Sequence, residues 1–208
     1  MGMGNTVGSR EPCIAFTARK QQVLWVTPHQ LEILIGCILG DAHVTPRGQV
    51  RIEHSKKQND YILWKYKKLR SISYPNPPQS YIIHDRRTDE DYKAMRFSTR
   101  QYFRPLRSKF YQESRKIFPL KMKISALTLA VWYMDDGHFE RKKKRAILAT
   151  DNFTKNEIKI ITNLISQLFG VSGVIRKSGK LVFAGHDCAK FFEIIDQYII
   201  ESMRYKVC

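Results

Sequence analysis

Two apolar segments that each end in an aspartate constrain the fold of this chain more than any other feature. The first reads LIGCILGDAH and the second reads LAVWYMDDGH. Aligned, they place Asp41 opposite Asp136, 95 residues further along the chain, and Gly40 opposite Asp135. A carboxylate at the end of a helix faces the negative end of the helix dipole. Each aspartate therefore needs a compensating positive charge, and only Asp136 of the adjacent pair has a counterpart in the first copy.

The segments that follow the two motifs repeat one order of elements, which is typical of a duplicated architecture. Apolar spacing and turn residues predict helix, hairpin, helix, hairpin and helix in each copy. The first copy covers residues 28–41, 42–54, 56–69, 79–99 and 100–118, and the second covers 126–136, 137–151, 154–170, 171–185 and 186–206. We therefore divide the chain into an N-terminal arm or tail (1–27), a first half (28–119) and a second half (120–208).

Local signals support several of these boundaries. Pro105 must lie in the first turn of its helix, because proline is tolerated there. Thr154 and Glu157 have the spacing of a capping box, and Gly170 can end the helix that this box begins. The last hairpin is expected to turn at Ser178 and Gly179.

The two matched aspartates can meet only if the two motif helices pack against each other. Gly36 and Gly40 lie four residues apart on one helix face, and Ala126 and Ala130 offer small side chains on the second helix. Close packing would bring the two carboxylates together, where a hard divalent cation such as Mg²⁺ would balance their charge. We expect Asp135, opposite Gly40, to serve in packing or as a hydrogen-bond acceptor.

The formal charge of +17, from 36 Lys and Arg against 19 Asp and Glu, predicts a polyanionic partner. Nucleic acid is favoured over an anionic membrane surface, and the 43% hydrophobic content argues against a disordered basic tail. The four cysteines lack zinc-binding spacing, and no apolar run reaches the length of a membrane span. Two carboxylates that hold Mg²⁺ beside a nucleic acid imply phosphodiester hydrolysis.

At these motifs the sequence resembles the LAGLIDADG homing endonucleases, or meganucleases. LIGCILGDA and LAVWYMDDG occupy the nine motif positions, and WYMDDG is similar to the two-motif, single-chain, intron-encoded subgroup. The similarity extends through LGDAHVTPRGQVRIEHSKKQNDYILWKYKKL and FRPLRSKFYQESRKIFP, over about residues 28–206. It implies an α+β fold with two pseudo-symmetric αββαββα halves, whose saddle-shaped antiparallel sheets lie along the DNA major groove. It also implies a monomer that cuts both strands of a long asymmetric site and leaves short 3′ overhangs.

The resemblance further implies the residues of the active site. Asp41 and Asp136 would bind metal and act in catalysis, with Lys116 (in RKIFP) and Lys206 (in MRYK) as the basic residue of each half. Lys121 and Lys123 are alternatives to Lys116. Further metal ligands would be backbone groups of Gly40, Ala42, Asp135 and Gly137. Mg²⁺ is the expected cofactor, Mn²⁺ is expected to substitute for it, and Ca²⁺ is expected to bind without supporting cleavage.

Alternate strand positions of such a sheet face the DNA, where Arg can read guanine and Asn or Gln can read adenine. Most basic residues should contact phosphates. The candidates are His43, Arg47, Gln49, Arg51, Arg86, Arg96, Ser98, His138, Arg141, Lys143, Arg145, Arg176, Lys177 and Lys180. The two histidines, each two residues past a motif aspartate, either lie near the central base pairs or face solvent.

Two other functions compete with the endonuclease. A group I intron RNA maturase, or splicing cofactor, would keep the fold and the basic surface with little or no cleavage, but here all four catalytic positions are filled. A transcription factor derived from the same fold is disfavoured because no second DNA-binding domain follows. An intracellular site is expected, in a mitochondrion, chloroplast or bacterial cytoplasm, with no membrane association.

Overall fold

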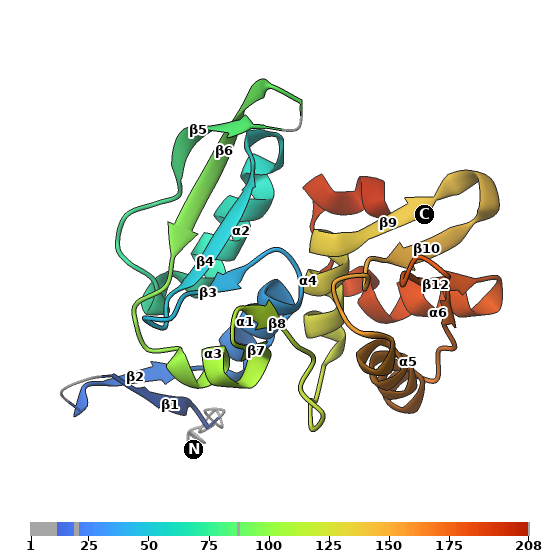
Figure 1. The fold of residues 1–208 in the computed structure, drawn as a ribbon, viewed down its shortest axis with the longest axis horizontal. Coiled ribbons are helices and arrows are strands. Elements are labelled where there is room, and N and C mark those ends of the chain that lie inside the picture. The colour runs from blue at the N-terminus through green and yellow to red at the C-terminus, as the bar shows by residue number, and fades with distance from the viewer. Residues whose placement is uncertain (1–11, 19–20, 87, 208) are drawn as a thin grey trace, which may run out of the picture.

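The first half contains one four-stranded antiparallel sheet and three helices. The computed structural model describes residues 12–18, 21–86 and 88–207 (Figure 1). In chain order the elements are α1 (Pro28–Leu39), β3 (His43–Val44), β4 (Val50–Ser55), a 3₁₀ turn (Lys56–Gln58), α2 (Asn59–Leu69), a 3₁₀ turn (Arg70–Ile72), β5 (Gln79–Asp85), β6 (Glu90–Ser98) and α3 (Arg104–Phe110). The sheet order is β3-β4-β6-β5.

The second half repeats this order. Its elements are α4 (Ala126–Asp136), β9 (Gly137–Glu140), a 3₁₀ turn (Arg141–Lys143), β10 (Arg145–Leu148), α5 (Lys155–Phe169), β11 (Val174–Ile175), β12 (Leu181–Ala184) and α6 (His186–Ile195). The sheet order, β11-β12-β10-β9, places the strand that follows the motif helix at one edge, as in the first half. The duplicated αββαββα order expected from the sequence is confirmed.

The motif helices α1 and α4 pack against each other between the two sheets (Figure 1). A Cβ built on Gly36 would lie 2.7 Å from the Cβ of Val131 and 2.8 Å from the Thr128 carbonyl oxygen. Thr128 also donates a hydrogen bond from Oγ1 to the Glu32 carbonyl oxygen (3.2 Å). The close approach expected at Gly36 is therefore present, and the nearest atoms on α4 belong to Thr128 and Val131.

The hydrogen bonds expected at the two ends of helix α5 are present. Thr154 accepts from the Glu157 amide through Oγ1 (3.3 Å), and the Glu157 carboxylate accepts from the Thr154 amide (2.7 Å). Gly170 ends α5 in the left-handed conformation, with φ +63°. A capping box that we did not predict, between Thr27 and Gln30, begins α1.

The described part of the N-terminal segment is an ordered arm rather than a loose tail. Strands β1 (Ile14–Thr17) and β2 (Val23–Val26) form a hairpin. Phe16 packs against Phe103 of the first half, with ring centroids 5.0 Å apart. Residues 1–11 lie outside the described part of the chain.

Two predicted helices are shorter than expected. The segment 100–118 is helical only over Arg104–Phe110, because Glu113 adopts a φ of +55° and turns the chain into a small hairpin, β7 (Tyr111–Gln112) and β8 (Arg115–Lys116). The segment 186–206 leaves the α-helix at Ile195 and continues as two 3₁₀ segments (Asp196–Tyr198 and Glu201–Lys206) separated by extended backbone. Each irregular segment contains one of the two lysines expected at the active site, Lys116 on β8 and Lys206 in the last 3₁₀ segment.

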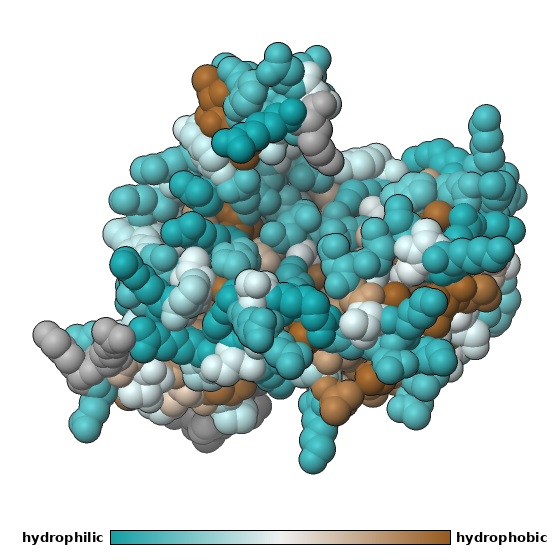
Figure 2. Space-filling view, in the orientation of Figure 1, coloured by the Kyte–Doolittle hydropathy of each residue, from teal (hydrophilic) through white to brown (hydrophobic). Residues whose placement is uncertain are grey.

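Hydrophilic side chains cover most of the face shown in Figure 2, as the net charge predicts. No helix in the described part of the chain combines the length and the apolarity needed to cross a lipid bilayer.

Candidate active site

The packing of α1 on α4 places the two motif aspartates at the same end of the helix pair. Asp41 follows Gly40, the residue that caps the C-terminus of α1, and Asp136 is the last residue of α4. Burial and the nearby charges of Asp41 and Asp135 raise the pKa of Asp136 to about 7. Burial and the charge of Asp135 also raise the pKa of Asp41. The protein thus holds these carboxylates where their negative charge is poorly compensated, which is an environment that a cation would stabilise.

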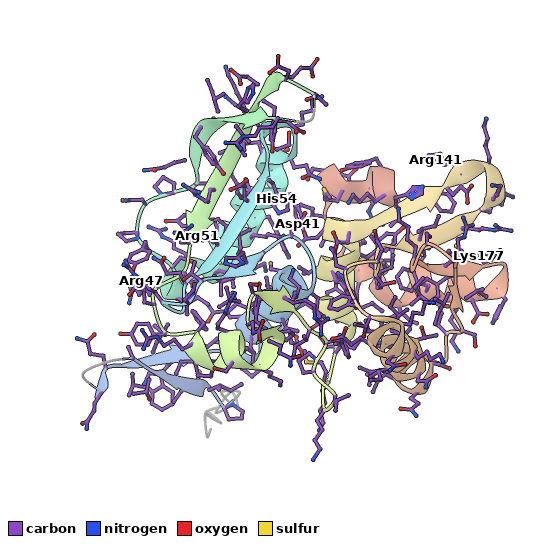
Figure 3. The ribbon with its side chains drawn as sticks, viewed as in Figure 1. Asp41, Arg47, Arg51, His54, Arg141 and Lys177 are labelled. Atoms are coloured by element: carbon purple, nitrogen blue, oxygen red, sulfur yellow. The ribbon has the colours of Figure 1, made fainter. Side chains whose placement is uncertain are left out.

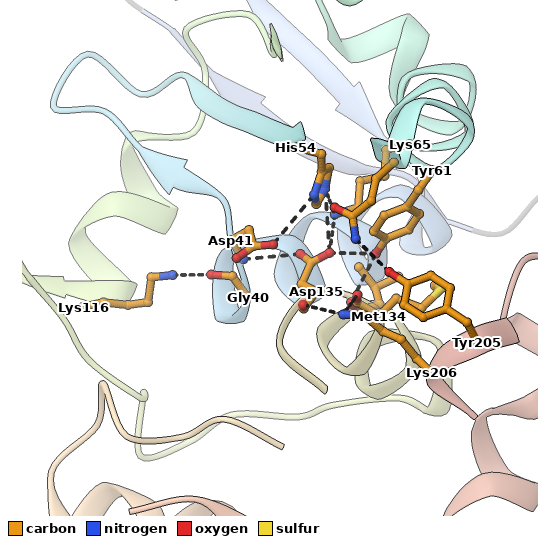
Figure 4. A network of polar contacts seen from close by, with 12 residues as sticks. Gly40, Asp41, His54, Tyr61, Lys65, Lys116, Met134, Asp135, Tyr205 and Lys206 are labelled. Atoms are coloured by element: carbon orange, nitrogen blue, oxygen red, sulfur yellow. Dashed lines mark hydrogen bonds and ion pairs between the residues drawn. The ribbon is translucent and has the colours of Figure 1, made fainter. Parts of the chain in front are cut away.

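A lysine from each half reaches the residue before its motif aspartate. Lys116 donates from Nζ to the Gly40 carbonyl oxygen (2.6 Å). Lys206 donates to the Asp135 carbonyl oxygen (2.8 Å) and to that of Met134 (2.6 Å) (Figure 4). Because Gly40 and Asp135 are aligned positions, the two lysines occupy corresponding places.

The alternatives to Lys116 lie elsewhere. Lys121 and Lys123 are exposed in the segment between the halves. Lys116 instead sits on β8, and its neighbour Arg115 anchors that strand by a 2.9 Å ion pair to Glu157 at the start of α5. Burial lowers the pKa of both Lys116 and Lys206, while the three neighbouring aspartates oppose this change.

Asp135 lies beneath the two motif aspartates, and its side chain is fully buried. Its Oδ1 accepts from the Lys65 ammonium (2.6 Å) and from the Tyr61 hydroxyl (2.8 Å), and its Oδ2 accepts from the backbone N–H of Asp41 (3.3 Å). A Cβ built on Gly40 would lie 2.5 Å from the Asp135 Cβ. Asp135 thus packs against Gly40 and accepts hydrogen bonds across the helix interface.

The sequence analysis did not identify Lys65, a buried lysine next to Asp135. The Lys65 side chain is 1% exposed and lies on the same face of α2 as Tyr61, Ile62 and Leu69. Burial alone would lower the pKa of Lys65, but the Asp135 carboxylate more than offsets this effect and raises it. The signal was available in the spacing, since a lysine four residues after a core tyrosine lies on the buried face of the helix.

His54 joins the same cluster from β4. Its Nε2 lies 2.9 Å from the Lys65 ammonium nitrogen, and its Nδ1 lies 3.7 Å from Oδ2 of Asp41. Asp41, His54 and Asp135 place possible ligand atoms within 4.8 Å of one another. Lys65, however, already provides the positive charge next to Asp135, so this carboxylate is committed to an ion pair and is a poor candidate for a metal ligand.

The first sheet brings several predicted DNA-contacting residues onto one face. His43 pairs with Arg51, Arg51 with Ser98, and Glu53 with Arg96 across adjacent strands. His43, Arg51 and Arg96 line the same hollow as Asp41. By alternation, the intervening residues Ile52 and His54 are buried beneath α2.

Three other first-half candidates do not line this hollow. Arg47 is exposed at the turn between β3 and β4 (Figure 3), and it lines a separate hollow with Arg100 and Arg104. Gln49 donates to the Tyr74 hydroxyl at 3.5 Å. Arg86 is exposed at the tip of the β5–β6 hairpin.

In the second sheet, fewer candidates lie on the strands. His138 pairs with Ile147, and Arg145 pairs with Glu140. The others lie in the turns between strands: Arg141 and Lys143 before β10, and Arg176, Lys177 and Lys180 before β12. Lys143 and Arg176 contact Glu140 at 2.9 Å and 3.6 Å. The predicted DNA-contacting residues of this half are therefore mostly at hairpin ends.

Comparison with known proteins identifies the fold. A model of the LAGLIDADG DNA endonuclease family matches residues 31–191. The chain belongs to this family. The structure is also similar to that of "the homing endonuclease I-WcaI bound to its DNA recognition sequence", with a TM-score of 0.76, 26% identity and 86% of each chain covered.

Relatives in this family carry different names. The cytochrome b mRNA maturase bI2 of Debaryomyces hansenii is 27% identical over 85% of this chain and 72% of its own length. A probable intron-encoded endonuclease of Wickerhamomyces canadensis is 26% identical over 90% of this chain and 87% of its own length. The RecA protein of Mycolicibacterium flavescens is 26% identical, and this chain spans about half of it (49%).

Proposed function

We propose that this protein is a site-specific endonuclease that hydrolyses both strands of duplex DNA with a divalent metal ion and leaves short 3′ overhangs. The observation that carries the proposal is the paired arrangement of Asp41 with Lys116 and Asp136 with Lys206, one pair from each half. Family membership and the DNA-bound relative support it.

The chain offers the oxygen donors that Mg²⁺ prefers. Asp41 and Asp136 would hold the metal, assisted by backbone groups of Gly40, Ala42, Asp135 and Gly137. Their raised pKa values support this assignment, because burial and the neighbouring negative charges disfavour the ionised carboxylates and a divalent cation would offset both effects. When bound, the ion would supply Lewis-acid stabilisation of the phosphate and lower the pKa of a coordinated water.

The lysines would act on the same phosphates. The Lys116 and Lys206 ammonium groups would stabilise the negative charge that develops on a phosphate oxygen during hydrolysis. The sheets would hold the duplex on the face that carries His43, Arg51 and Arg96 in the first half, with basic hairpin ends as phosphate contacts in the second. Because these two faces differ, the recognised site would be long and asymmetric.

The test is cleavage of a randomised plasmid library with Mg²⁺, Mn²⁺ or Ca²⁺ as the only divalent ion. We expect double-strand breaks at one sequence with Mg²⁺ and Mn²⁺, and binding without breaks with Ca²⁺. Sequencing the ends would determine the overhang. Tight DNA binding with no cleavage under any of the three metals would overturn the proposal.

A second function is favoured by one observation, the similarity to the yeast cytochrome b mRNA maturase. The protein would then assist splicing of a group I intron RNA, alone or together with DNA cleavage, in a mitochondrion, chloroplast or bacterium. Competition between a folded group I intron RNA and target duplex DNA would test it. Displacement of the RNA by tRNA at the same concentration would argue against specific RNA recognition.

A further inference from the structure

Beneath Asp41, a chain of hydrogen bonds begins at a buried ammonium group. Lys65 contacts Oδ1 of Asp135 at 2.6 Å and Nε2 of His54 at 2.9 Å. A lysine ammonium can only donate hydrogen bonds. Because Lys65 forms a 2.6 Å ion pair with the Asp135 carboxylate, its ammonium donates to His54 and Nε2 of His54 is the acceptor.

The acceptor role of Nε2 determines where the imidazole proton lies. A ring nitrogen that accepts a hydrogen bond carries no proton, so the imidazole is neutral and its proton lies on Nδ1. The pKa of His54, which burial and the Lys65 charge lower to about 3, agrees with this assignment. That N–H lies 3.7 Å from Oδ2 of Asp41 (Figure 4). This is longer than a direct hydrogen bond, but such contacts often shorten once substrate binds.

Gln58 is the other neighbour of this ring. Its Nε2 donates to the hydroxyl of Tyr205 at 3.2 Å, which leaves its side-chain oxygen as the group that can accept from His54. Gln58 and Asp41 line the same hollow. Because Nε2 of His54 accepts from Lys65, the Nδ1–H is the one donor of the ring, and the Gln58 oxygen and the Asp41 carboxylate are its two candidate acceptors.

The second half has no equivalent of this chain. Strand pairing matches His43–Arg51 to His138–Ile147, so that His54 corresponds to Thr150. Thr150 donates instead to the Gly179 carbonyl oxygen (2.6 Å). Counting from the helix starts, Lys65 corresponds to Ile161. In the described parts of the chain, no Lys, Arg or His nitrogen lies within 4.0 Å of the Asp136 carboxylate, whereas Nδ1 of His54 lies 3.7 Å from Oδ2 of Asp41.

We propose that Lys65 and His54 are positioning residues that orient Asp41 but not Asp136, so that the two DNA strands are cut at unequal rates. The inference rests on the proposed nuclease function. Neither residue is catalytic in this proposal. His54 acts on the reaction only through Asp41, and Lys65 acts only through His54. Partners outside the metal ligands typically change metal affinity or activity by about 10–100-fold when removed.

The first measurement is independent of catalysis. Long-range ¹⁵N–¹H spectra of the imidazole rings in the metal-free protein report the tautomer of each histidine, and His54→Asn assigns the His54 signal. We expect the neutral Nδ1–H form of His54 between about pH 5 and 8, because its Nε2 accepts from the Lys65 ammonium. A neutral Nε2–H ring, or a protonated ring, would overturn the proposal even if the protein cuts DNA well.

The second measurement is the rate of nicking of each strand, with the two strands labelled separately. His54→Leu removes the donor, whereas His54→Asn keeps an amide N–H close to the position of Nδ1. We expect His54→Leu to slow one strand by about 10–100-fold and to accumulate nicked DNA. His54→Asn should recover part of the lost rate.

Thr150→Val is the matched control at the corresponding second-half position and should leave the ratio of strand rates unchanged. Equal slowing of both strands by His54→Leu, or equal strand rates in the wild type, would refute the inference. Failure of the wild-type protein to cut any DNA would refute the nuclease proposal itself, while the tautomer measurement would still test the positioning of the ring.

Discussion

Beneath its motif aspartate, the first half contains the charged and polar side chains Lys65, His54 and Tyr61, whereas the second half has Ile161 and Thr150 at the corresponding positions of Lys65 and His54. Both halves nevertheless present an aspartate and a lysine in the same relation. The duplicated backbone thus preserves the reactive groups while the supporting interior differs. Asp135 explains the difference. It belongs to the second half, but its buried carboxylate packs against the first half and needs the positive charge of Lys65 there.

Removal of a motif carboxylate should have the largest effect. Asp136→Asn keeps the size of the side chain but removes its charge, so the metal site loses a ligand. Cleavage of both strands should fall by more than the roughly hundredfold cost of losing an outer partner, while DNA binding stays within about tenfold because phosphate contacts supply most of the affinity. Single-turnover cleavage and filter binding measure the two quantities. Asp151→Asn, exposed in the same half, is the control; normal cleavage by Asp136→Asn would exclude Asp136 as a ligand.

Lys65→Met should have the largest effect on stability. It leaves the Asp135 carboxylate buried without its counter-charge, which typically costs about 3–5 kcal/mol. Urea denaturation measures the loss. The double variant Lys65→Met/Asp135→Asn should recover part of it, because the unpaired charge is gone.

The corresponding second-half change, Ile161→Val, should cost only about 0.5–1.5 kcal/mol. If Lys65→Met were no more destabilising than Ile161→Val, Asp135 would not depend on Lys65 for its charge, and the contrast between the two interiors would have no energetic basis.

The sequence predicts the features that the two halves share, but it does not predict the buried cluster that distinguishes them. The motif aspartates and the repeated order of elements follow from patterns that lie along the chain, and the two lysines follow from the resemblance to the family. The Lys65–His54–Asp135 cluster joins α2, β4 and α4, and no local pattern determines which long-range contacts form. Lys65 nevertheless lies on the apolar face of its predicted helix, which shows that a charged residue at a core position is an informative signal.

The two shortened helices show a different limit. Residues 100–118 and 186–206 have helical periodicity, but each segment makes polar contacts with the other half. Glu157 in the second half accepts from the Phe118 amide (3.1 Å) and binds Arg115, which stabilises the hairpin over the helix. In the second segment, the Tyr205 hydroxyl accepts from Gln58 of the first half (3.2 Å), and Ile199 is buried between the two 3₁₀ segments. Tertiary contacts override local periodicity in both places.

The inequality of the two motif carboxylates should also appear as a pH dependence of stability. The folded-state pKa of Asp136 is raised from 3.8 to about 7. Below about pH 4 this aspartate is protonated in both states, and its contribution to stability is lost as the pH rises through about 7. In metal-free buffer, the difference in melting temperature between Asp136→Asn and wild type should therefore grow from pH 5 to pH 8.

Comparing the two proteins cancels the opposite effect of His54, whose lowered pKa makes stability rise with pH below about 6.5. Mg²⁺ should stabilise the wild type more at pH 8 than at pH 5, because it competes with the proton for the same carboxylate. A constant difference between the two proteins across this range would mean that Asp136 has an ordinary pKa.

Gly36→Ala tests the contact that brings the halves together. The added methyl group would lie 2.7 Å from the Val131 Cβ and 2.8 Å from a carbonyl oxygen, so the helices must separate slightly. Overpacking of this kind costs about 1–3 kcal/mol. Leu63→Ala, at an exposed position of α2, is a control that should change stability by less than about 0.5 kcal/mol. Unchanged stability and strand rates in Gly36→Ala would show that the interface tolerates a wider separation.

The smallest effect is expected from single phosphate contacts, and it distinguishes the two DNA-facing surfaces. Lys177 is exposed in the turn before β12, where the second half carries most of its predicted contacts (Figure 3). Lys177→Gln should weaken binding to all sequences alike and reduce the slope of log affinity against log salt by about one unit. Lys67→Gln is the matched control, because α2 covers the sheet face opposite the one that carries Arg51 and Arg96. If both substitutions lowered the slope equally, the duplex would not be confined to that face, and the outer helix of the first half would have to contact DNA as well.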